Sequence, residues 1–158
     1  MADEYPLIAF RFEVQLTISN PQRFGLTSPL CGGQFSEVEG LEMTNELKTV
    51  REGGNNLKQI HLVGPLTYGQ LTLKRGMTTN LDLWKWFAAA AGGVENGRGT
   101  VAQGSVVVSD ASNTPQLRFN LTDCLPVKIK APSLNAKDGA VAVEEMQIAY
   151  SSFTVSAA

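Results

Sequence analysis

Apolar and polar side chains alternate strictly near the start of the chain. Even-numbered positions are apolar and odd-numbered positions are polar, with Phe10, Phe12, Val14, Leu16 and Ile18 set against Arg11, Glu13, Gln15 and Thr17. A two-residue period places the two sets on opposite faces of a strand. The pattern predicts a first strand over 10–18 with one buried face. Residues 19–33 are rich in proline, glycine, serine and asparagine, which is typical of a loop, and strand character returns at Phe35.

A second stretch of alternation predicts a long β-hairpin over residues 41–62. Apolar residues recur on both sides of its tip, at Leu41, Met43, Leu47, Leu57, Ile60 and Leu62. The tip, 51–56, contains glycines and asparagines, which adopt the positive φ angles of tight loops at the lowest cost. Because the flanks are only weakly apolar, we expect the hairpin to project beyond the core. We interpret Gly64-Pro65 as a turn that precedes a strand over 68–76.

One helix is predicted over residues 81–91. Asn80 is a suitable N-terminal cap, Asp82 complements the helix dipole, and Gly92-Gly93 provides a stop. The polar stripe consists only of Asp82 and Lys85, and the other positions are apolar: Leu81, Leu83, Trp84, Trp86, Phe87 and four alanines. A helix that is apolar on most sides is buried on most sides. One sandwich covers only one of these sides, which is a first indication of oligomerisation.

The remainder of the chain is predicted to form strands. After a glycine-rich loop over 92–99, strands are expected over 101–109 and 116–122, joined by a polar turn, and over 127–130.

The last segment changes its apolar period. Val141 and Val143 are apolar at odd positions, whereas Met146, Ile148 and Tyr150 are apolar at even positions. We interpret this slip as a β-bulge at Glu144-Glu145. Because no repeat or domain boundary is evident, residues 1–158 are expected to form a single domain that is mostly β with one buried helix.

Composition and charge limit the partners without naming one. The chain has 158 residues, of which 43% are hydrophobic, and a formal net charge of -2. This length is sufficient for a real core, and the small charge creates no basic field that would gather nucleic acid or anionic lipid. The first six residues are acidic where a signal peptide is basic, and no apolar run is long enough to span a bilayer. We expect a protein that is made and folded in the cytosol.

Candidate catalytic and metal-binding side chains are sparse. His61 is the only histidine, and it lies in a predicted strand between Ile60 and Leu62. A structural or surface role is favoured, because catalytic triads need a histidine beside an orienting carboxylate and a nucleophile. Cys31 and Cys124 fit neither a CxxC pattern nor a disulfide scaffold and are expected to be reduced, partly buried thiols. The sequence predicts no enzyme, no metal site and no cofactor.

Three further groups of residues permit a chemical interpretation, but a structural one is favoured for each. Alternation places Glu37 and Glu39 on one strand face, and with Glu42 they suit solvated or intersubunit charge better than acid-base catalysis. The glycine-rich segment 51–55 lacks the framework of a phosphate-binding loop and precedes a strand. Trp84 and Trp86 could stack on a base or sugar, although a buried helix favours core packing.

The order of several motifs resembles a known family. The motifs are Phe35-Ser36-Glu37-Val38-Glu39-Gly40-Leu41, Arg51-Glu52-Gly53-Gly54-Asn55, Tyr68-Gly69 with Leu71-Thr72-Leu73-Lys74-Arg75-Gly76, Leu83-Trp84-Lys85-Trp86, and the ending Pro126-Val127-Lys128, Ala131-Pro132-Ser133-Leu134 and Val141-Ala142-Val143-Glu144. They are similar to the tail tube proteins of contractile phages and of phage-derived extracellular injection systems. The sequence departs from that pattern at Val63-Gly64-Pro65, where many relatives have a leucine-proline-glycine order.

The resemblance implies an antiparallel β-sandwich or small barrel with a flanking helix and a projecting hairpin. It also implies hexameric rings stacked into a tube, whose edge strands pair around the lumen. The implied partners are further copies of the chain, a sheath protein, baseplate and cap proteins, and cargo in the lumen, with nucleic acid only if a phage genome passes. The particle would be phage-tail-like and made in the bacterial cytoplasm. The implied assembly residues are Glu37, Glu39, Arg51, Glu52, Gly53, Gly54, Asn55, Asn56 and Trp84.

Three alternatives remain open at this point. The chain could form a specialised tube-initiating ring at the baseplate, or a secreted tube of the type VI kind. The third alternative is a monomeric binding module that uses exposed tryptophans, such as a carbohydrate-binding sandwich.

Overall fold

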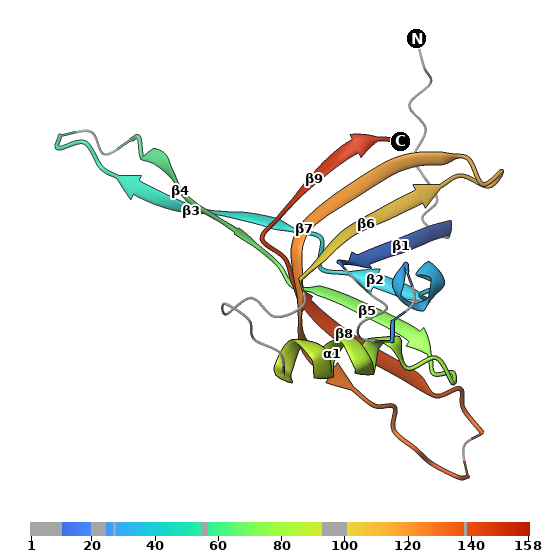
Figure 1. The fold of residues 1–158 in the computed structure, drawn as a ribbon. Coiled ribbons are helices and arrows are strands. Elements are labelled where there is room, and N and C mark those ends of the chain that lie inside the picture. The colour runs from blue at the N-terminus through green and yellow to red at the C-terminus, as the bar shows by residue number, and fades with distance from the viewer. Residues whose placement is uncertain (1–10, 20–24, 27, 55–56, 93–100, 138) are drawn as a thin grey trace.

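Strands dominate the structure of this chain (Figure 1). The computed structural model describes residues 11–19, 25–26, 28–54, 57–92, 101–137 and 139–158. Its strands are β1 (Arg11–Ile18), β2 (Glu37–Glu39), β3 (Met43–Val50), β4 (Ile60–Tyr68), β5 (Leu71–Gly76), β6 (Ala102–Ser109), β7 (Pro115–Lys130), β8 (Val143–Ala149) and β9 (Ser152–Ala157). The helices among the described residues are α1 (Asp82–Gly92) and a short 3-10 helix, η2 (Leu30–Gly33), which lies in the predicted loop over 19–33. The prediction of a mostly β chain with one α-helix is confirmed.

The long strand β7 is shared by two antiparallel layers. Its first half lies between β6 and β9, and β6 pairs in turn with β1. Its second half pairs with β8, which is followed by β5 and β2. Between the halves Asp123 has a positive φ of 51°, and the register with β8 shifts between Pro126 and Lys128. The antiparallel sandwich is confirmed, but the strands predicted over 116–122 and 127–130 are one continuous strand.

The core draws side chains from both layers and from α1. Its buried members include Val14, Leu16, Ile18, Leu71, Leu73, Leu83, Trp86, Val106, Leu121, Met146 and Ile148. The even-numbered positions of β1 therefore face inward, as the two-residue period predicts, and Phe12 packs on the same side. Phe10 lies outside the described residues. Burying each of these large apolar side chains contributes about 1.5–3 kcal/mol.

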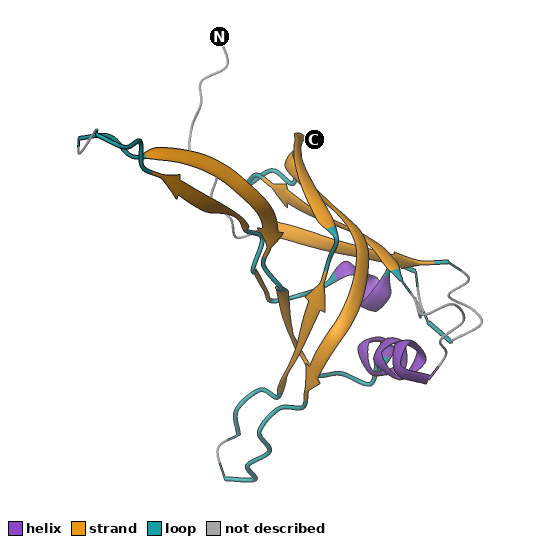
Figure 2. Ribbon diagram, turned by 90° about the vertical axis from the view of Figure 1, so that its left-hand side faces the viewer, coloured by secondary structure: helices purple, strands orange, loops and turns teal. Residues whose placement is uncertain are grey.

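Helix α1 packs beside the sandwich against β7 and η2 (Figures 1 and 2). The predicted cap is confirmed, because Asn80 Oδ1 accepts a hydrogen bond of 2.9 Å from the Asp82 amide. Asp82, one of the two residues of the predicted polar stripe, does not face solvent. Its side chain is buried and accepts a hydrogen bond of 2.9 Å from the Cys31 amide, which joins α1 to η2. Leu81 is 44% exposed, so one chain alone leaves part of the apolar helix surface uncovered.

Two predicted irregularities lie elsewhere in the structure. Gly64-Pro65 is not a turn, because β4 continues through it to Tyr68, and only Gly69 and Gln70 separate β4 from β5. The predicted bulge at Glu144-Glu145 is also wrong, since β5 and β8 pair there without any shift of register. Glu144 points inward and is fully buried, which explains why the apolar period breaks at this position.

Candidate assembly interface

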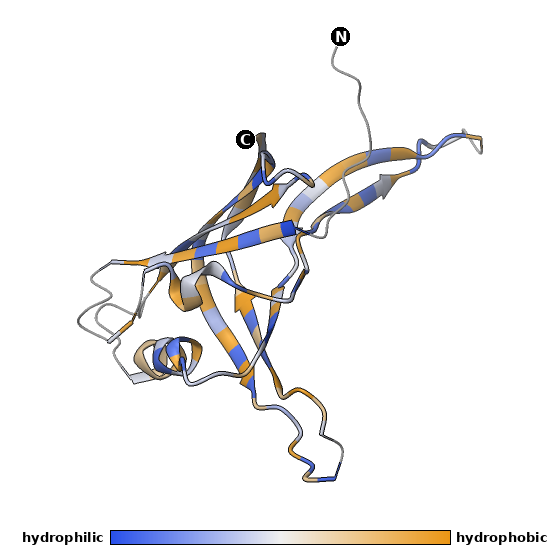
Figure 3. Ribbon diagram, turned by 90° about the vertical axis from the view of Figure 1, so that its right-hand side faces the viewer, coloured by the Kyte–Doolittle hydropathy of each residue, from blue (hydrophilic) through white to orange (hydrophobic). Residues whose placement is uncertain are grey.

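Strands β3 and β4 form a separate two-stranded ribbon that projects from the sandwich (Figure 1). We call residues 43–68, which comprise both strands and their connecting tip, the arm. Apolar and polar positions alternate along it (Figure 3), and its large apolar side chains are exposed: Met43, Leu47, Val50, Leu57, Ile60, Leu62, Val63 and Leu66. The predicted projection of the hairpin is therefore confirmed. Such a concentration of exposed apolar side chains is typical of an interaction surface.

A bulge divides the arm into an inner and an outer half. The pairing of β3 with β4 shifts between Asn45 and Leu47, so that Gly64 and Pro65 have no paired partner in β3. A Cβ atom on Gly64 would collide with the carbonyl oxygen of Glu46, so only glycine fits there without a shift of the backbone. Proline is tolerated at a bulge because no ladder hydrogen bond is required of it.

An aromatic cluster fixes the base of the arm to the sandwich. Tyr68, at the end of β4, makes edge contacts with Tyr150 and Phe153, both at ring-centroid distances of 5.7 Å. The Tyr150 hydroxyl donates a hydrogen bond of 2.9 Å to the carbonyl oxygen of Gly40, just before β3. Burial raises the pKa of Tyr150, so this donor keeps its proton well above neutral pH. These contacts set the direction in which the arm leaves the body.

The tip of the arm carries most of the predicted assembly residues. Arg51, Glu52, Gly53 and Gly54 are all exposed, and no atom of the described residues lies within 4 Å of a Cβ atom placed on either glycine. Gly54 has a φ of +90°, the left-handed conformation that the glycine-rich tip predicts. Asn55 and Asn56 lie outside the described residues. The tip is therefore free to approach a partner, although its contacts remain a prediction.

Glu37 and Glu39 both pair with Lys74 and do not form a pair of catalytic carboxylates. They lie on edge strand β2 and form ion pairs of 3.4 and 3.8 Å with the Lys74 ammonium on β5. Both carboxylates thus share one strand face, as alternation predicts. Glu37 is the main cause of the raised pKa of Lys74. Because both acids are more than half exposed, they are compatible with further contacts beyond this chain.

Trp84 belongs to a buried charged network that the analysis of apolar and polar positions does not predict. Its Nε1–H group donates a hydrogen bond of 2.8 Å to Glu144 Oε2, while Arg75 forms an ion pair with Glu144 Oε1. The Arg75 guanidinium also donates a hydrogen bond to the Asn80 carbonyl oxygen, at the start of the helix. A signal for this network exists in the sequence, because Arg75 and Glu144 both occupy inward positions of their strands. The predicted intersubunit role of Trp84 is not tested by these contacts.

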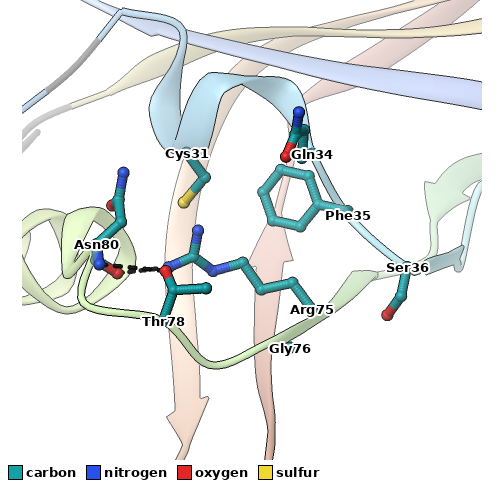
Figure 4. Close-up of a pocket in the computed structure, with 8 residues that line it drawn as sticks. All are labelled: Cys31, Gln34, Phe35, Ser36, Arg75, Gly76, Thr78 and Asn80. Carbon is teal, nitrogen blue, oxygen red and sulfur yellow. Dashed lines mark hydrogen bonds between the residues drawn. The ribbon is translucent and has the colours of Figure 1, made fainter.

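A pocket of about 420 Å³ opens above the Arg75 side chain (Figure 4). Its lining combines η2, the segment before β2 and the segment before α1: Cys31, Gln34, Phe35, Ser36, Arg75, Gly76, Thr78 and Asn80. Burial raises the pKa of the Cys31 thiol to about 12, despite the opposing effect of Arg75. Cys124 is similarly buried, with a pKa of about 12, and neither cysteine forms a disulfide. The predicted reduced, buried thiols are confirmed, and a protonated thiol is a poor nucleophile.

The described residues hold no cluster that suits a metal ion. No group of three or more histidine, cysteine, aspartate or glutamate side chains gathers among them. His61 lies exposed on β4, opposite Thr49 in the arm. Within the described part of the chain, no helix is long and apolar enough to cross a membrane.

These features define a class of protein: a β-sandwich subunit whose exposed apolar arm and open sheet edges suit assembly. The T4-like virus tail tube protein gp19 family model matches residues 8–154. The chain belongs to this family. The resemblance derived from its sequence motifs is thereby confirmed.

Solved structures share the fold at low sequence identity. A chain of the 6-fold symmetrised baseplate of the anti-feeding prophage is 21% identical, with a TM-score of 0.81 over 97% of both chains. A chain of the extended sheath-tube complex of PVC, an extracellular contractile injection system, is 19% identical, with a TM-score of 0.77 over 99% of this chain and 95% of that one. A type six secretion system protein is 14% identical, with a TM-score of 0.56 over 92% of this chain and 83% of that one. No curated protein matches the sequence.

Proposed function

We propose that this chain is the inner tube protein of a contractile injection system or contractile phage tail. Copies form hexameric rings that stack into a hollow tube, and the whole chain acts as one domain in this assembly. The role is mechanical rather than enzymatic, which agrees with membership of a tail tube family. A contracting sheath drives the rigid tube through an envelope, and cargo passes through the lumen.

The exposed apolar arm is the observation that carries this proposal. An isolated two-stranded ribbon is marginally stable in water, yet Leu47 is 62% exposed and Val63 is 75% exposed in the single chain. Removing such side chains from water contributes about 25 cal/mol per Å² of apolar surface. A neighbouring copy that covers the arm supplies this stabilisation, and the glycine tip permits close approach to it.

The first layer of the sandwich is suited to ring closure. Its outer strands are β1 and β9, each of which is paired on one side only among the residues that the structure describes. The strand directions alternate from β1 through β6 and β7 to β9, so a neighbour's β1 placed beside β9 continues the antiparallel order. A closed ring of such layers leaves no open edge.

Apolar side chains near these two edges support the same contact. Val155 on β9 shares the inward side with Phe153 but is 50% exposed. At the opposite edge, a pocket of about 720 Å³ beside β1 is lined in part by Phe12 and Phe35. We place Val155 of one copy against these aromatic rings of the next. Glu37, Glu39 and Trp84 then remain candidates for the outer parts of the subunit contacts.

The partners of related assemblies indicate those of this chain. The similar chains come from structures described as a sheath-tube complex, a baseplate and a cap. We accordingly propose a sheath protein, baseplate proteins and a cap as partners, in a phage-tail-like particle assembled in the bacterial cytoplasm. The similarity to a baseplate chain, with a TM-score of 0.81, also supports a second candidate function as a specialised ring at the start of the tube.

Negative-stain electron microscopy of the purified protein tests the proposal. Stacked rings or tubes with a central channel are expected, either from the protein alone or after addition of the neighbouring sheath and baseplate gene products. Rings that never elongate without baseplate proteins would favour the specialised ring. A monomer that persists under every condition would overturn both functions and favour a binding module.

A further inference from the structure

The arm presents two distinct faces, and its bulge determines which side chains lie on each. Directly opposed residues of an antiparallel pair point to the same face, and the face alternates along the strand. Beyond the bulge, Leu47 opposes Val63, and Lys48 opposes Leu62. Val63 and Leu62 are adjacent in sequence and therefore lie on opposite faces of the ribbon.

The first face is apolar from the base of the arm to the Leu47 and Val63 pair, apart from Asn45, and it becomes polar near the tip, where Thr49 opposes His61. It carries Met43, Leu47, Val63 and Leu66, because the extra residue in β4 brings Leu66 and Val63 to the same side. These side chains are between 46% and 75% exposed. The face also includes Tyr68 and so continues into the aromatic cluster at the base of the arm. We call it the long face.

The second face is apolar only near the tip. It carries Val50, Ile60 and Leu62 in the outer half, with exposed fractions of 46%, 41% and 50%. On the same face Lys48 lies opposite Leu62, and the pair Thr44 and Thr67 lies on the inner side of the bulge, nearer the body. Its apolar patch therefore adjoins the exposed tip at Arg51 to Gly54. We call it the distal face.

We infer that the two faces of the arm bind two different copies of the chain at once. The inference rests on the proposed function and goes beyond it, since it assigns a separate contact to each face. A ribbon one layer thick has no core of its own, and a single partner surface covers only one of its sides. Copies of the same chain are the occupants under the proposed function, since the chain belongs to a family of tail tube proteins.

The difference between the faces assigns the contacts. The long face is continuous with the body of the subunit, and permanent interfaces are the more apolar and extensive ones. We therefore assign the long face to the contact with the neighbouring copy in the same ring. The distal face lies in the outer half of the arm, next to the glycines of the tip. We therefore assign it to the contact with a subunit of the adjacent ring. Ring formation and stacking are thus separate functions of adjacent residues.

Adjacent substitutions on opposite faces provide a matched test. Val63→Glu is expected to abolish rings, with a purified protein that remains monomeric in light scattering. Leu62→Glu is expected to leave rings intact but to prevent their stacking, with at least a tenfold loss of tubes in negative stain. Val141→Glu, which adds the same charge at an exposed position outside the arm, is expected to assemble normally. Circular dichroism of each variant should match that of the unmodified protein, because both arm positions are solvent-exposed in the single chain.

The outcomes separate the inference from the function on which it rests. If Val63→Glu and Leu62→Glu give the same assembly defect, or if their effects are exchanged, the assignment of two contacts is wrong even though tubes form. If the unmodified protein forms neither rings nor tubes with its partners, the proposed function itself fails. Normal assembly of both variants would likewise overturn the two-contact inference.

Discussion

At the scale of single residues, the buried pair of Arg75 and Glu144 departs most from what the sequence predicts. Alternation treats charged side chains as outward, so a glutamate at an inward position is misread as a slip in register. The strand register itself is regular, and the carboxylate is neutralised by Arg75 on the neighbouring strand and accepts a hydrogen bond from the indole N–H group of Trp84. The network links β5, β8 and α1, which lie far apart in sequence. Alternation can place both charged side chains at inward positions, but it does not indicate that they pair with each other.

Removing the Glu144 carboxylate should therefore be costly. Glu144→Ala leaves the Arg75 charge buried without its partner, and we expect a loss of about 3–5 kcal/mol in the free energy of unfolding. The double variant Arg75→Met, Glu144→Leu should be less destabilised, because an apolar pair needs no neutralising charge. Urea unfolding monitored by tryptophan fluorescence measures both. Glu145→Ala, on the less buried side of the same strand, serves as the control, and equal losses at both positions would contradict this account.

The two thiols predict a stability change at alkaline pH. Burial raises both pKa values to about 12 from the ordinary value of 9.0. Above pH 9 the unfolded chain loses these protons while the folded chain keeps them, so stability falls as pH rises, by up to about 1.4 kcal/mol per pH unit for each thiol. Urea unfolding between pH 8.5 and 10.5 should show a shallower decline for Cys124→Ala than for the unmodified protein. Identical slopes would contradict the burial argument.

At the scale of elements, the sequence predicts strands well and their boundaries less well. β1 and β6 lie where alternation places them, and α1 begins at its predicted cap. Gly64-Pro65 is misread because this dipeptide ordinarily marks a turn, whereas here it forms a bulge in a ribbon with free outer edges. The direction of the arm could not be predicted either, since Tyr150 and Phe153 fix it from the opposite end of the chain.

The bulge makes a specific demand on Gly64. Gly64→Ala places a methyl group against the Glu46 carbonyl oxygen, so the pairing of β3 with β4 must open or shift. We expect amide hydrogen exchange in the arm to accelerate at least tenfold, while the urea midpoint of the sandwich changes little because the arm lies outside the core. Gly53→Ala is the matched control, since open space surrounds that position. Unchanged exchange in Gly64→Ala would show that the backbone accommodates the methyl group.

At the scale of the whole molecule, the arm and the open edges divide assembly into distinct tasks. The edges β1 and β9 suit lateral contacts around a ring, and the tip of the arm lies well away from both β2 and α1 (Figures 1 and 2). The predicted assembly residues are therefore not one site. Glu37 and Glu39 belong to an outer edge, Trp84 belongs to a buried network, and the tip is a separate surface.

A bulky charge at the tip should block stacking without unfolding the subunit. Gly53→Arg adds a long cationic side chain where close approach to the next ring is proposed, and none of the residues that the structure describes lies within 4 Å of its first carbon. We expect rings to persist while the mean tube length in negative stain falls at least tenfold. Thermal unfolding of the subunit should not change, which separates an assembly defect from misfolding. Gly53→Ala should form tubes of ordinary length, because its methyl group adds little volume and no charge. Tubes of normal length from Gly53→Arg would show that the tip does not contact the next ring. The stacking contact would then have to be made by the distal face alone.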